Sequence, residues 1–295
     1  MDILNVLQIV FPVFCVIAIG YIFAGIKEID LDPVLDILIY ITIPALVISS
    51  LSQKSFLPAE LILTAISVIG VVLICGGLCY IYLRITRRTD LKGLYLPTMF
   101  MNSGNMAFPL AFLAFGSEGL SVAVLYYVSI SILVYTLGIY IAKGTGGMKE
   151  IFRLPLIYAA AISIILNLAH IKLPAFVLDT TTMMGAATIP LMQISLGVRL
   201  RSTKISMIST SITASLIRIA GGVAAAYIIV TLLGIEGLNK KVIILASSMP
   251  AAVITFIMSH KYKVDSALVA STVAISTLIS VITTPLVLLW LMTMD

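Results

Sequence analysis

The sequence predicts an all-α membrane protein in which ten transmembrane helices form two inverted repeats of five helices each. Three observations lead to this prediction: an apolar composition, an uneven distribution of basic residues among the loops, and a repeated pattern of proline-containing segments. Hydrophobic residues make up 61% of the 295 residues and charged residues 11%, and the mean hydropathy is +1.17. Because soluble domains are charged at about a quarter of their positions, this composition excludes a soluble protein.

Ten apolar segments are long enough to cross a bilayer, which takes about 20 residues of helix. In chain order they are 5–26, 34–53, 59–83, 92–115, 119–142, 153–170, 175–198, 204–233, 240–259 and 264–293. The connections between them are short, so no separate soluble domain is expected. The chain begins with Met-Asp and has no basic residue before Cys15, so the first segment lacks the charged start of a signal peptide and is expected to be retained.

Lysine and arginine are concentrated in alternate loops, namely those after the first, third, fifth, seventh and ninth segments. The remaining loops carry only Lys54, Lys172, Lys240 and Lys241. By the positive-inside rule the basic loops are cytoplasmic, so both termini are expected outside a cell (cytoplasmic) membrane. The formal net charge of +5 therefore reflects membrane topology, and nucleic-acid binding is not expected.

The two halves of the chain, 1–148 and 149–295, repeat one pattern. The string Thr-Ile-Pro ends at Pro44 in the second segment and at Pro190 in the seventh, and Ile-Ser follows each at the same spacing. A helix break expected near Pro109 in the fourth segment is matched by one at Pro250 in the ninth. Since five segments is an odd number, the halves must have opposite orientations, which is typical of secondary transporters with broken helices.

The fourth segment carries the most informative polar residues, between Asn102 and Pro109. A broken helix inside a membrane must be covered by protein or line a cavity. Asn102 and Asn105 supply amides and Gly104 allows close approach. We predict that the half-helix ends here bind an anion, with Asn105 in direct contact and Asn102 bracing the crossover, although these roles could be exchanged. The alternative is a structural kink whose amides satisfy the freed carbonyl groups.

Four further residues are candidates for substrate binding. Ser247 and Ser248 precede Pro250, and they either contact substrate or bond back to the preceding turn. Gln193 either faces the cavity or bonds between helices. Arg218 lies in the eighth segment, where a charge is costly. It either pairs with a substrate carboxylate or a protein acid, or extends to the cytoplasmic surface.

No metal site, cofactor or enzymatic activity is expected. Cys75 and Cys79 have no histidine or acidic neighbours, and His170 and His260 lie at loop edges. No acidic residue lies clearly within a segment, so a sodium site has little support and a proton-coupled or uncoupled carrier is at least as plausible.

The string Asn-Ser-Gly-Asn-Met-Ala-Phe-Pro at 102–109 and the C-terminal stretch from Met249 to Pro285 resemble the auxin efflux carrier family, whose prokaryotic members include organic-acid permeases. The short connection at 143–153 is similar to that of prokaryotic members. The resemblance implies the fold of bile-acid symporters and sodium/proton antiporters, with helices 4 and 9 crossing at the substrate site. It also implies a homodimer in which helices 3–5 and 8–10 move against a scaffold of helices 1, 2, 6 and 7.

Together these observations predict a secondary active carrier of small organic anions, such as auxin-like or malate-like carboxylates, working by an elevator mechanism. Its expected partners are the anion, the lipid bilayer and a second copy of the chain. A channel or membrane sensor that uses the same broken helices is the alternative.

Overall fold

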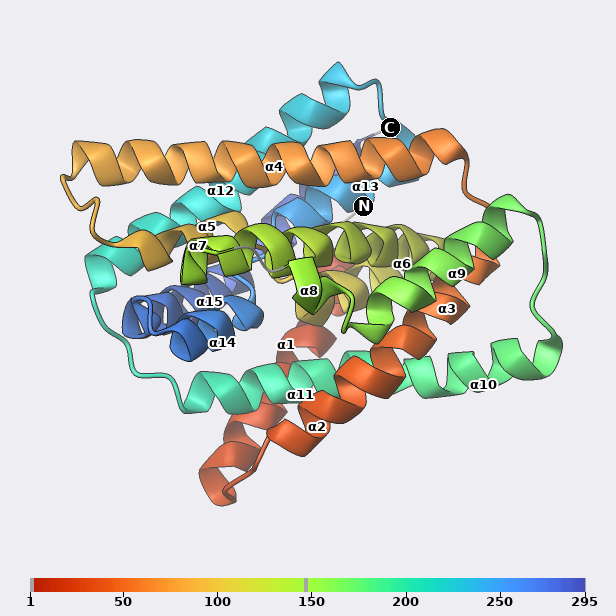
Figure 1. Ribbon diagram of the computed structural model, residues 1–295, viewed down its shortest axis with the longest axis horizontal. Helices are drawn as coiled ribbons and strands as arrows, with labels where there is room; N and C mark the ends of the chain where they lie inside the picture. The colour runs from red at the N-terminus through yellow and green to blue at the C-terminus, as the bar shows by residue number, and fades with distance from the viewer. Residues whose placement is uncertain (1–2, 146–147, 295) are drawn as a thin grey trace.

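The computed structural model describes residues 3–145 and 148–294, and these fold almost entirely as helices (Figure 1). In this part of the chain, the β-structure is limited to an isolated antiparallel bridge between Met101 and Ala251. Among the described residues, seven helical segments are long and apolar enough to cross a membrane: Ile3–Ile26, Asp32–Gln53, Pro58–Ile85, Ser103–Lys143, Ala175–Arg201, Ile208–Leu232 and Ser266–Thr293. The chain is therefore an all-α protein with the features of a multi-pass membrane protein.

Three of the ten predicted spans differ from long continuous helices. The sixth is the shorter helix α9 (Pro155–Leu168), and the fourth and ninth are each broken in two. The fifth continues directly from the second half of the fourth, with a non-helical residue at Gly116, where φ is 68°. The total of ten spans and the inverted repeat stay predictions. The predicted first half, 1–148, includes residues 1–2 and 146–147, which lie outside the described residues.

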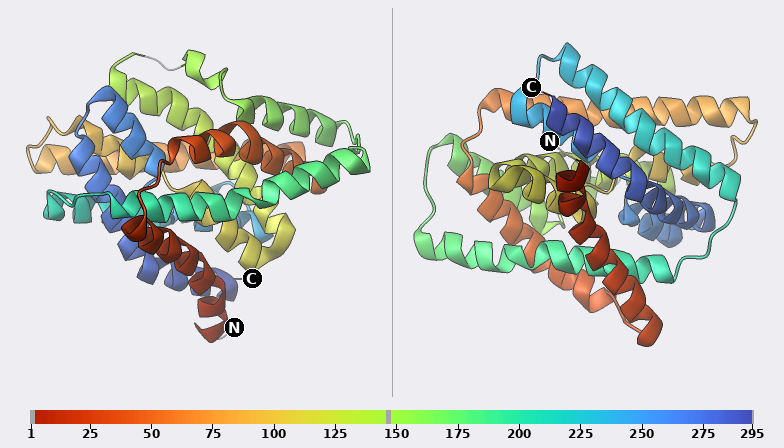
Figure 2. Two further views of the ribbon diagram at one scale, coloured as in Figure 1. Left: turned by 90° about the horizontal axis from the view of Figure 1, so that it is seen from below. Right: turned by 180° about the vertical axis from the view of Figure 1, so that it is seen from behind.

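One group of helices contains α11 (Thr188–Arg201). Helix α1 (Ile3–Ile26) crosses α11 closely, and α3 (Ile43–Gln53) packs against α9 and α10 (Ala175–Ala186) (Figure 2). Glycine makes the first crossing possible, because a Cβ atom added to Gly197 would lie 2.0 Å from the carbonyl oxygen of Ile17. The backbones of α1 and α11 are therefore in direct contact.

A second group packs around α12 (Ile208–Leu232). Helix α4 (Pro58–Ile85) runs beside it, and α13 (Gly237–Ser247) and α15 (Ser266–Thr293) also contact it (Figure 1). Helix α6 (Phe108–Leu133) packs against α4 and α13, and it meets the first group at α3. The remaining elements are short: α2 (Asp32–Ile37), η1 (Leu38–Thr42), η2 (Lys92–Leu94), α5 (Tyr95–Met99), η3 (Ser103–Ala107), η4 (Val134–Gly138), α7 (Ile139–Lys143), α8 (Met148–Ile151) and α14 (Val253–Tyr262).

The repeated prolines lie where helices begin. Pro44 is in the first turn of α3, directly after the π-helix η1, and Pro190 is near the start of α11, which follows α10 after Ala187. A proline in the first helical turn lacks an N–H that would have no intrahelical partner anyway. A π-helix thus precedes Pro44, whereas only the single turn residue Ala187 separates α10 from the helix that contains Pro190.

The break in the fourth span is not at Pro109, where we expected it. The helical backbone is interrupted at Phe100–Asn102, and Pro109 lies in the first turn of α6, after the π-helix η3. Proline is accepted there for the same reason as at Pro44, so it does not itself break the helix. Met101 pairs with Ala251, so the counterpart of Pro250 is the 100–102 segment rather than Pro109.

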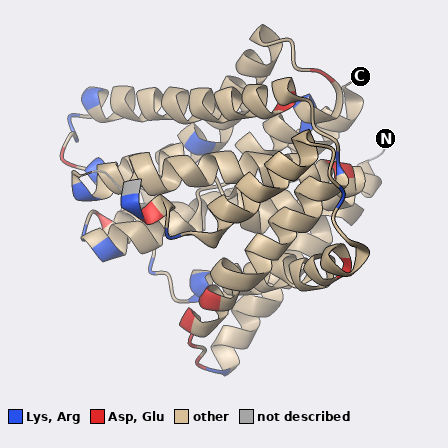
Figure 3. Cartoon of the chain, turned by 45° about the vertical axis from the view of Figure 1, so that its right-hand side comes forward, with Lys and Arg blue, Asp and Glu red and all other residues tan. Residues whose placement is uncertain are grey.

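Charged residues lie mostly near helix ends and in loops, with long uncharged stretches between them (Figure 3). Many large apolar side chains are exposed along α1 and α4, including Phe11 at 69% and Ile62 at 60%. Such surfaces suit a lipid environment, because hydrocarbon solvates apolar side chains at no cost. Arg218 is the exception to the charge pattern, since it is fully buried within α12.

Candidate substrate site at the paired helix breaks

The two helix breaks are joined by backbone hydrogen bonds. The backbone N–H of Asn102 donates to the carbonyl oxygen of Pro250 at 2.7 Å. The backbone N–H of Ala252 donates to the carbonyl oxygen of Phe100 at 3.0 Å. The amide of Ala251 donates to Ser276 Oγ at 3.1 Å. Backbone groups that lose their helical partners in a membrane interior must find others. These contacts supply them and fix the two breaks against each other.

Four helix ends therefore meet at the paired breaks. Helices α5 and α13 end there with Met99 and Ser247, whereas η3, which continues into α6, and α14 begin there with Ser103 and Val253. The start of a helix carries a partial positive charge and its end a partial negative charge. The paired breaks thus have a positive side and a negative side.

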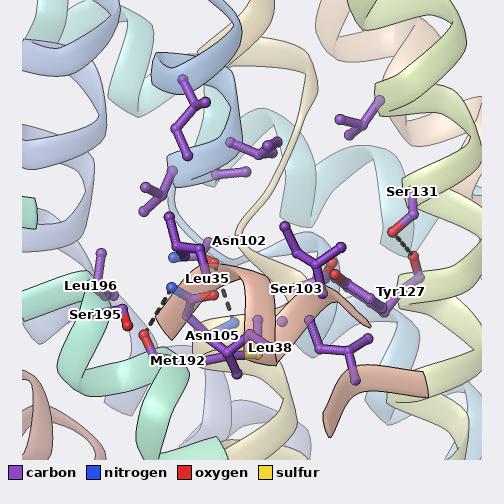
Figure 4. A pocket seen from close by; sticks show the side chains of 18 of the residues that line it. Leu35, Leu38, Asn102, Ser103, Asn105, Tyr127, Ser131, Met192, Ser195 and Leu196 are labelled. Atoms are coloured by element: carbon purple, nitrogen blue, oxygen red, sulfur yellow. Dashed lines mark hydrogen bonds between the residues drawn. The ribbon is translucent and has the colours of Figure 1, made fainter. Parts of the chain in front are cut away.

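A cavity of about 150 Å³ lies on the positive side (Figure 4). Residues 102–105 and 252–254, at the starts of η3 and α14, form one wall. Met192, Ser195, Leu196 and Arg199 of α11 form another, and Tyr127 and Ser131 of α6 also line it. Most of the remaining lining is apolar: Leu31, Leu35, Leu38, Ile39, Ile43, Ile130, Val134 and Ile257. The cavity thus offers a few polar groups within an apolar surface.

The two predicted asparagines lie together in this cavity (Figure 4). Asn102 Oδ1 accepts a hydrogen bond from the backbone N–H of Asn105 at 3.3 Å. The buried Nδ2 of Asn102 has no partner among the described residues. Asn105 Nδ2 donates to the carbonyl oxygen of Met192 at 3.2 Å. Asn102 thus stabilises the start of η3, and Asn105 links this start to α11.

Gly104 allows η3 to approach its neighbours. A Cβ atom added there would lie 2.6 Å from Met192 Cε and 3.1 Å from Tyr127 Cε2. Any larger residue would have to displace these side chains, which line the same cavity. Gly104 therefore sets the distance between the helix break and α11.

The other four predicted binding residues do not line the cavity. Ser248 Oγ bonds back to the carbonyl oxygen of Leu245 at 2.7 Å, which is the alternative that we left open for it. Ser247 Oγ lies 2.8 Å from the hydroxyl of Tyr126. Gln193 is buried, and its Nε2 has no partner among the described residues. All four side chains are buried without lining the cavity.

Arg218 lies on the negative side of the paired breaks. Its Nη1 donates to the carbonyl oxygens of Thr98 and Met99 at 3.0 and 2.8 Å, and its Nη2 donates to that of Ser247 at 3.0 Å. Of the two orientations that we considered, the structure has the buried one, and none of the described acidic residues forms an ion pair with it. The guanidinium binds the ends of α5 and α13.

Sequence reasoning missed several cavity residues. Arg199 lies at one of the basic loops that predict the topology, yet it lines the cavity one turn after Ser195, whose buried hydroxyl has no partner among the described residues. Ser195 belongs to the repeated Ile-Ser string, which was a usable signal. Tyr127 and Ser131 are four residues apart and so share a helix face, but nothing in the sequence identifies that face as the lining.

Two further cavities lie beside other parts of these helices. One of about 420 Å³ shares Leu35, Ile39 and Tyr135 with the first, and its charged lining residues come from three of the basic loops or the helix ends beside them: Asp32, Asp36, Glu150 and Lys261. Another, of about 380 Å³, lies farther along α3 and α10, between Ser49, Ser121 and Gly185. It shares no lining residue with the first cavity.

Within the described residues, no cluster of three or more His, Cys, Asp or Glu could hold a metal ion.

Comparisons with known proteins agree with this architecture. A family model described as "Membrane transport protein" matches residues 147–288. An uncharacterized transporter of Methanocaldococcus jannaschii is 29% identical over 296 residues, which cover 94% of this chain and 96% of the relative. An uncharacterized transporter of Methanothermobacter thermautotrophicus is 28% identical over 293 residues, covering 95% and 96%. These matches agree with the family resemblance drawn from residues 102–109 and 249–285: the second half of the chain is similar to the membrane transport protein family, and the whole chain is similar to two transporters.

Proposed function

We propose that this membrane transport protein is a secondary active carrier of small organic anions, and that the cavity at the paired breaks binds them. The observation that carries the proposal is the convergence of two helix starts and Arg199 on one cavity. Helix starts present free N–H groups and a partial positive charge to an anion. Among the described residues, no hydrogen bond or ion pair occupies the Arg199 guanidinium, so its charge is available to a ligand.

The lining favours an anion with an apolar body. Leu35, Leu38 and Ile257 offer apolar surface, whereas a small dicarboxylate would need polar partners at both of its ends. We therefore expect a monocarboxylate whose carboxylate faces Asn105 and Arg199. Its aliphatic or aromatic part would contact the apolar wall, so auxin-like acids fit this cavity better than malate-like ones.

Alternating access would occur by movement of the group around α12 against the group that contains α11, as in an elevator. Gly104 and Met192 line the first cavity, and α11 also lines the one beside Ser49, with Ile189 and Pro190. Sliding of η3 along α11 would close one cavity toward its side of the membrane and open the other. By the positive-inside rule, the side with Asp32 and Lys261 is the cytoplasmic one. The homodimer and the outside location of both termini stay predictions.

The experiment is uptake by the full-length protein in proteoliposomes. The panel contains phenylacetate, indole-3-acetate, hexanoate and malate, with phenylacetamide as an uncharged analogue, in the presence and absence of proton and sodium gradients. We expect saturable uptake of the apolar monocarboxylates, counter-flow by preloaded unlabelled acid, and no response to the amide. Equal uptake of the amide would contradict the anion site. A non-saturating current without counter-flow would make the protein a channel.

A further inference from the structure

Arg218 is the largest fully buried side chain, and all its hydrogen bonds go to main-chain carbonyl groups. Two of these carbonyls belong to Thr98 and Met99 at the end of α5, and the third to Ser247 at the end of α13. The ion pair that the described part of the chain contains joins Lys54 and Glu60, so no carboxylate there compensates the guanidinium. Its negative counterpart is therefore the pair of helix ends.

The space around the guanidinium is shaped for it. A Cβ atom added to Gly222, one turn after Arg218, would lie 2.2 Å from Arg218 Nη2 and 2.2 Å from the carbonyl oxygen of Ser247. The Ser247 side chain is held away from this contact by its hydrogen bond with Tyr126. The bond from Nη2 to Ser247 thus depends on the absence of a side chain at position 222.

Two helix ends without a positive partner would be unfavourable at this depth, since each carries about half a negative charge. In carriers with broken helices, such ends and the unwound carbonyls beside them commonly hold the coupling cation. Here a side chain of the protein fills that position.

We propose that Arg218 is a resident cation that takes the place of a bound coupling ion, so that the protein holds its paired breaks together and binds an anion without sodium. The part about anion binding rests on the proposed carrier function, whereas the part about the resident cation does not. Arg218 is accordingly a positioning residue, because it contacts the helix ends and does not line the cavity.

The test is thermal unfolding of the full-length protein in detergent, which needs no substrate. Native protein, Arg218→Ala and the control Arg199→Gln are compared in choline chloride, in sodium chloride of equal ionic strength, and in choline chloride with millimolar guanidinium. We expect the unfolding midpoint of the native protein to be the same in all three solutions, and we expect the same of Arg199→Gln. Arg218→Ala should be less stable in choline, and guanidinium, or more weakly sodium, should raise its midpoint by about 5 °C or more.

Either of two results would overturn the proposal: an Arg218→Ala midpoint that is equal in all three solutions, or a native midpoint that rises with sodium. Should Arg218→Ala yield no folded protein, Arg218→Lys and Arg218→Met separate charge from packing. We expect the unfolding midpoint of Arg218→Lys to stay close to the native one and that of Arg218→Met to fall. An equal fall in both variants would overturn the role of the charge. Gly222→Ala should lower the midpoint in all three solutions, because its methyl group fills the space of the Nη2 bond and blocks added guanidinium as well, whereas its neighbour Gly221→Ala should lower it less.

Discussion

The backbone amide of Asn102 donates a hydrogen bond of 2.7 Å to the carbonyl oxygen of Pro250, and this contact joins the two helix breaks of the chain. Proline has no N–H, so Pro250 can take part in such a pairing only as an acceptor. The bond holds the starts of η3 and α14 beside one cavity, and it brings the ends of α5 and α13 to Arg218. The paired breaks thus place opposite partial charges on their two sides.

Replacing Asn105 by Ala is expected to lower kcat/KM for the transported carboxylate by roughly 3- to 10-fold, because one hydrogen-bonding amide leaves the cavity. Its bond to the Met192 carbonyl, which couples the break to α11, is lost as well. Initial uptake rates in proteoliposomes measure the effect, normalised to folded protein. Asn5→Ala, an exposed asparagine on α1, is the matched control. An uptake rate of Asn105→Ala equal to that of the native protein would mean that Asn105 does not take part in substrate binding.

Replacing Arg199 by Gln is expected to raise KM for an anionic substrate about 10-fold, since a positive charge beside the cavity is lost. The effect should shrink for uncharged competitors of the same shape. Arg201→Gln is the control, because Arg201 is exposed and lies over the ring of Tyr21, at 5.0 Å from its centroid, rather than in the cavity. Concentration-dependent uptake of the best acid of the panel distinguishes the two variants. A similar KM in both would mean that Arg199 does not contact the substrate.

The sequence predicts the helical membrane architecture well, because apolar segments and polar interruptions are local properties. It predicts Asn102, Gly104 and Asn105 as residues of the candidate site for the same reason, and all three line the cavity. The exact break was misplaced at Pro109, since a proline either breaks a helix or begins one, and only the distant partner segment at 250–252 decides between them. The partners of Arg218 were also not predictable, because they are main-chain carbonyls on two other helices. Every residue has a main-chain carbonyl group, so the residue types do not show which carbonyl groups bind a side chain.

Asn167 is expected to be a stability determinant, although it lies outside the cavity. Its Nδ2 donates to the carbonyl oxygens of Leu51 and Lys54 at 2.8 and 2.5 Å, and its Oδ1 accepts from the amide of Phe56 at 3.0 Å. These bonds satisfy main-chain groups where α3 ends, so Asn167→Ala should cost about 1–3 kcal/mol and lower the unfolding midpoint by about 5 °C. Uptake per folded molecule should remain native. A large loss of transport at native stability would contradict a purely structural role.

The crossing of α1 and α11 gives the sharpest test of packing. A methyl group at position 197 would lie 2.0 Å from the carbonyl oxygen of Ile17 and 2.7 Å from the amide of Tyr21, so Gly197→Ala must push the two backbones apart. We expect a cost of about 1–3 kcal/mol and less monodisperse protein in size-exclusion chromatography.

Gly77→Ala is the matched control for this prediction. Gly77 also lies inside a helix, but its added methyl would meet nothing within 4 Å, so only the gain of up to about 1 kcal/mol in helix propensity remains. Because both variants make the same chemical change in a helix, the difference between their unfolding midpoints measures the close crossing alone. Equal midpoints would mean that the α1–α11 contact tolerates displacement. In that case α11 would be a poor fixed wall for a cavity whose other side moves.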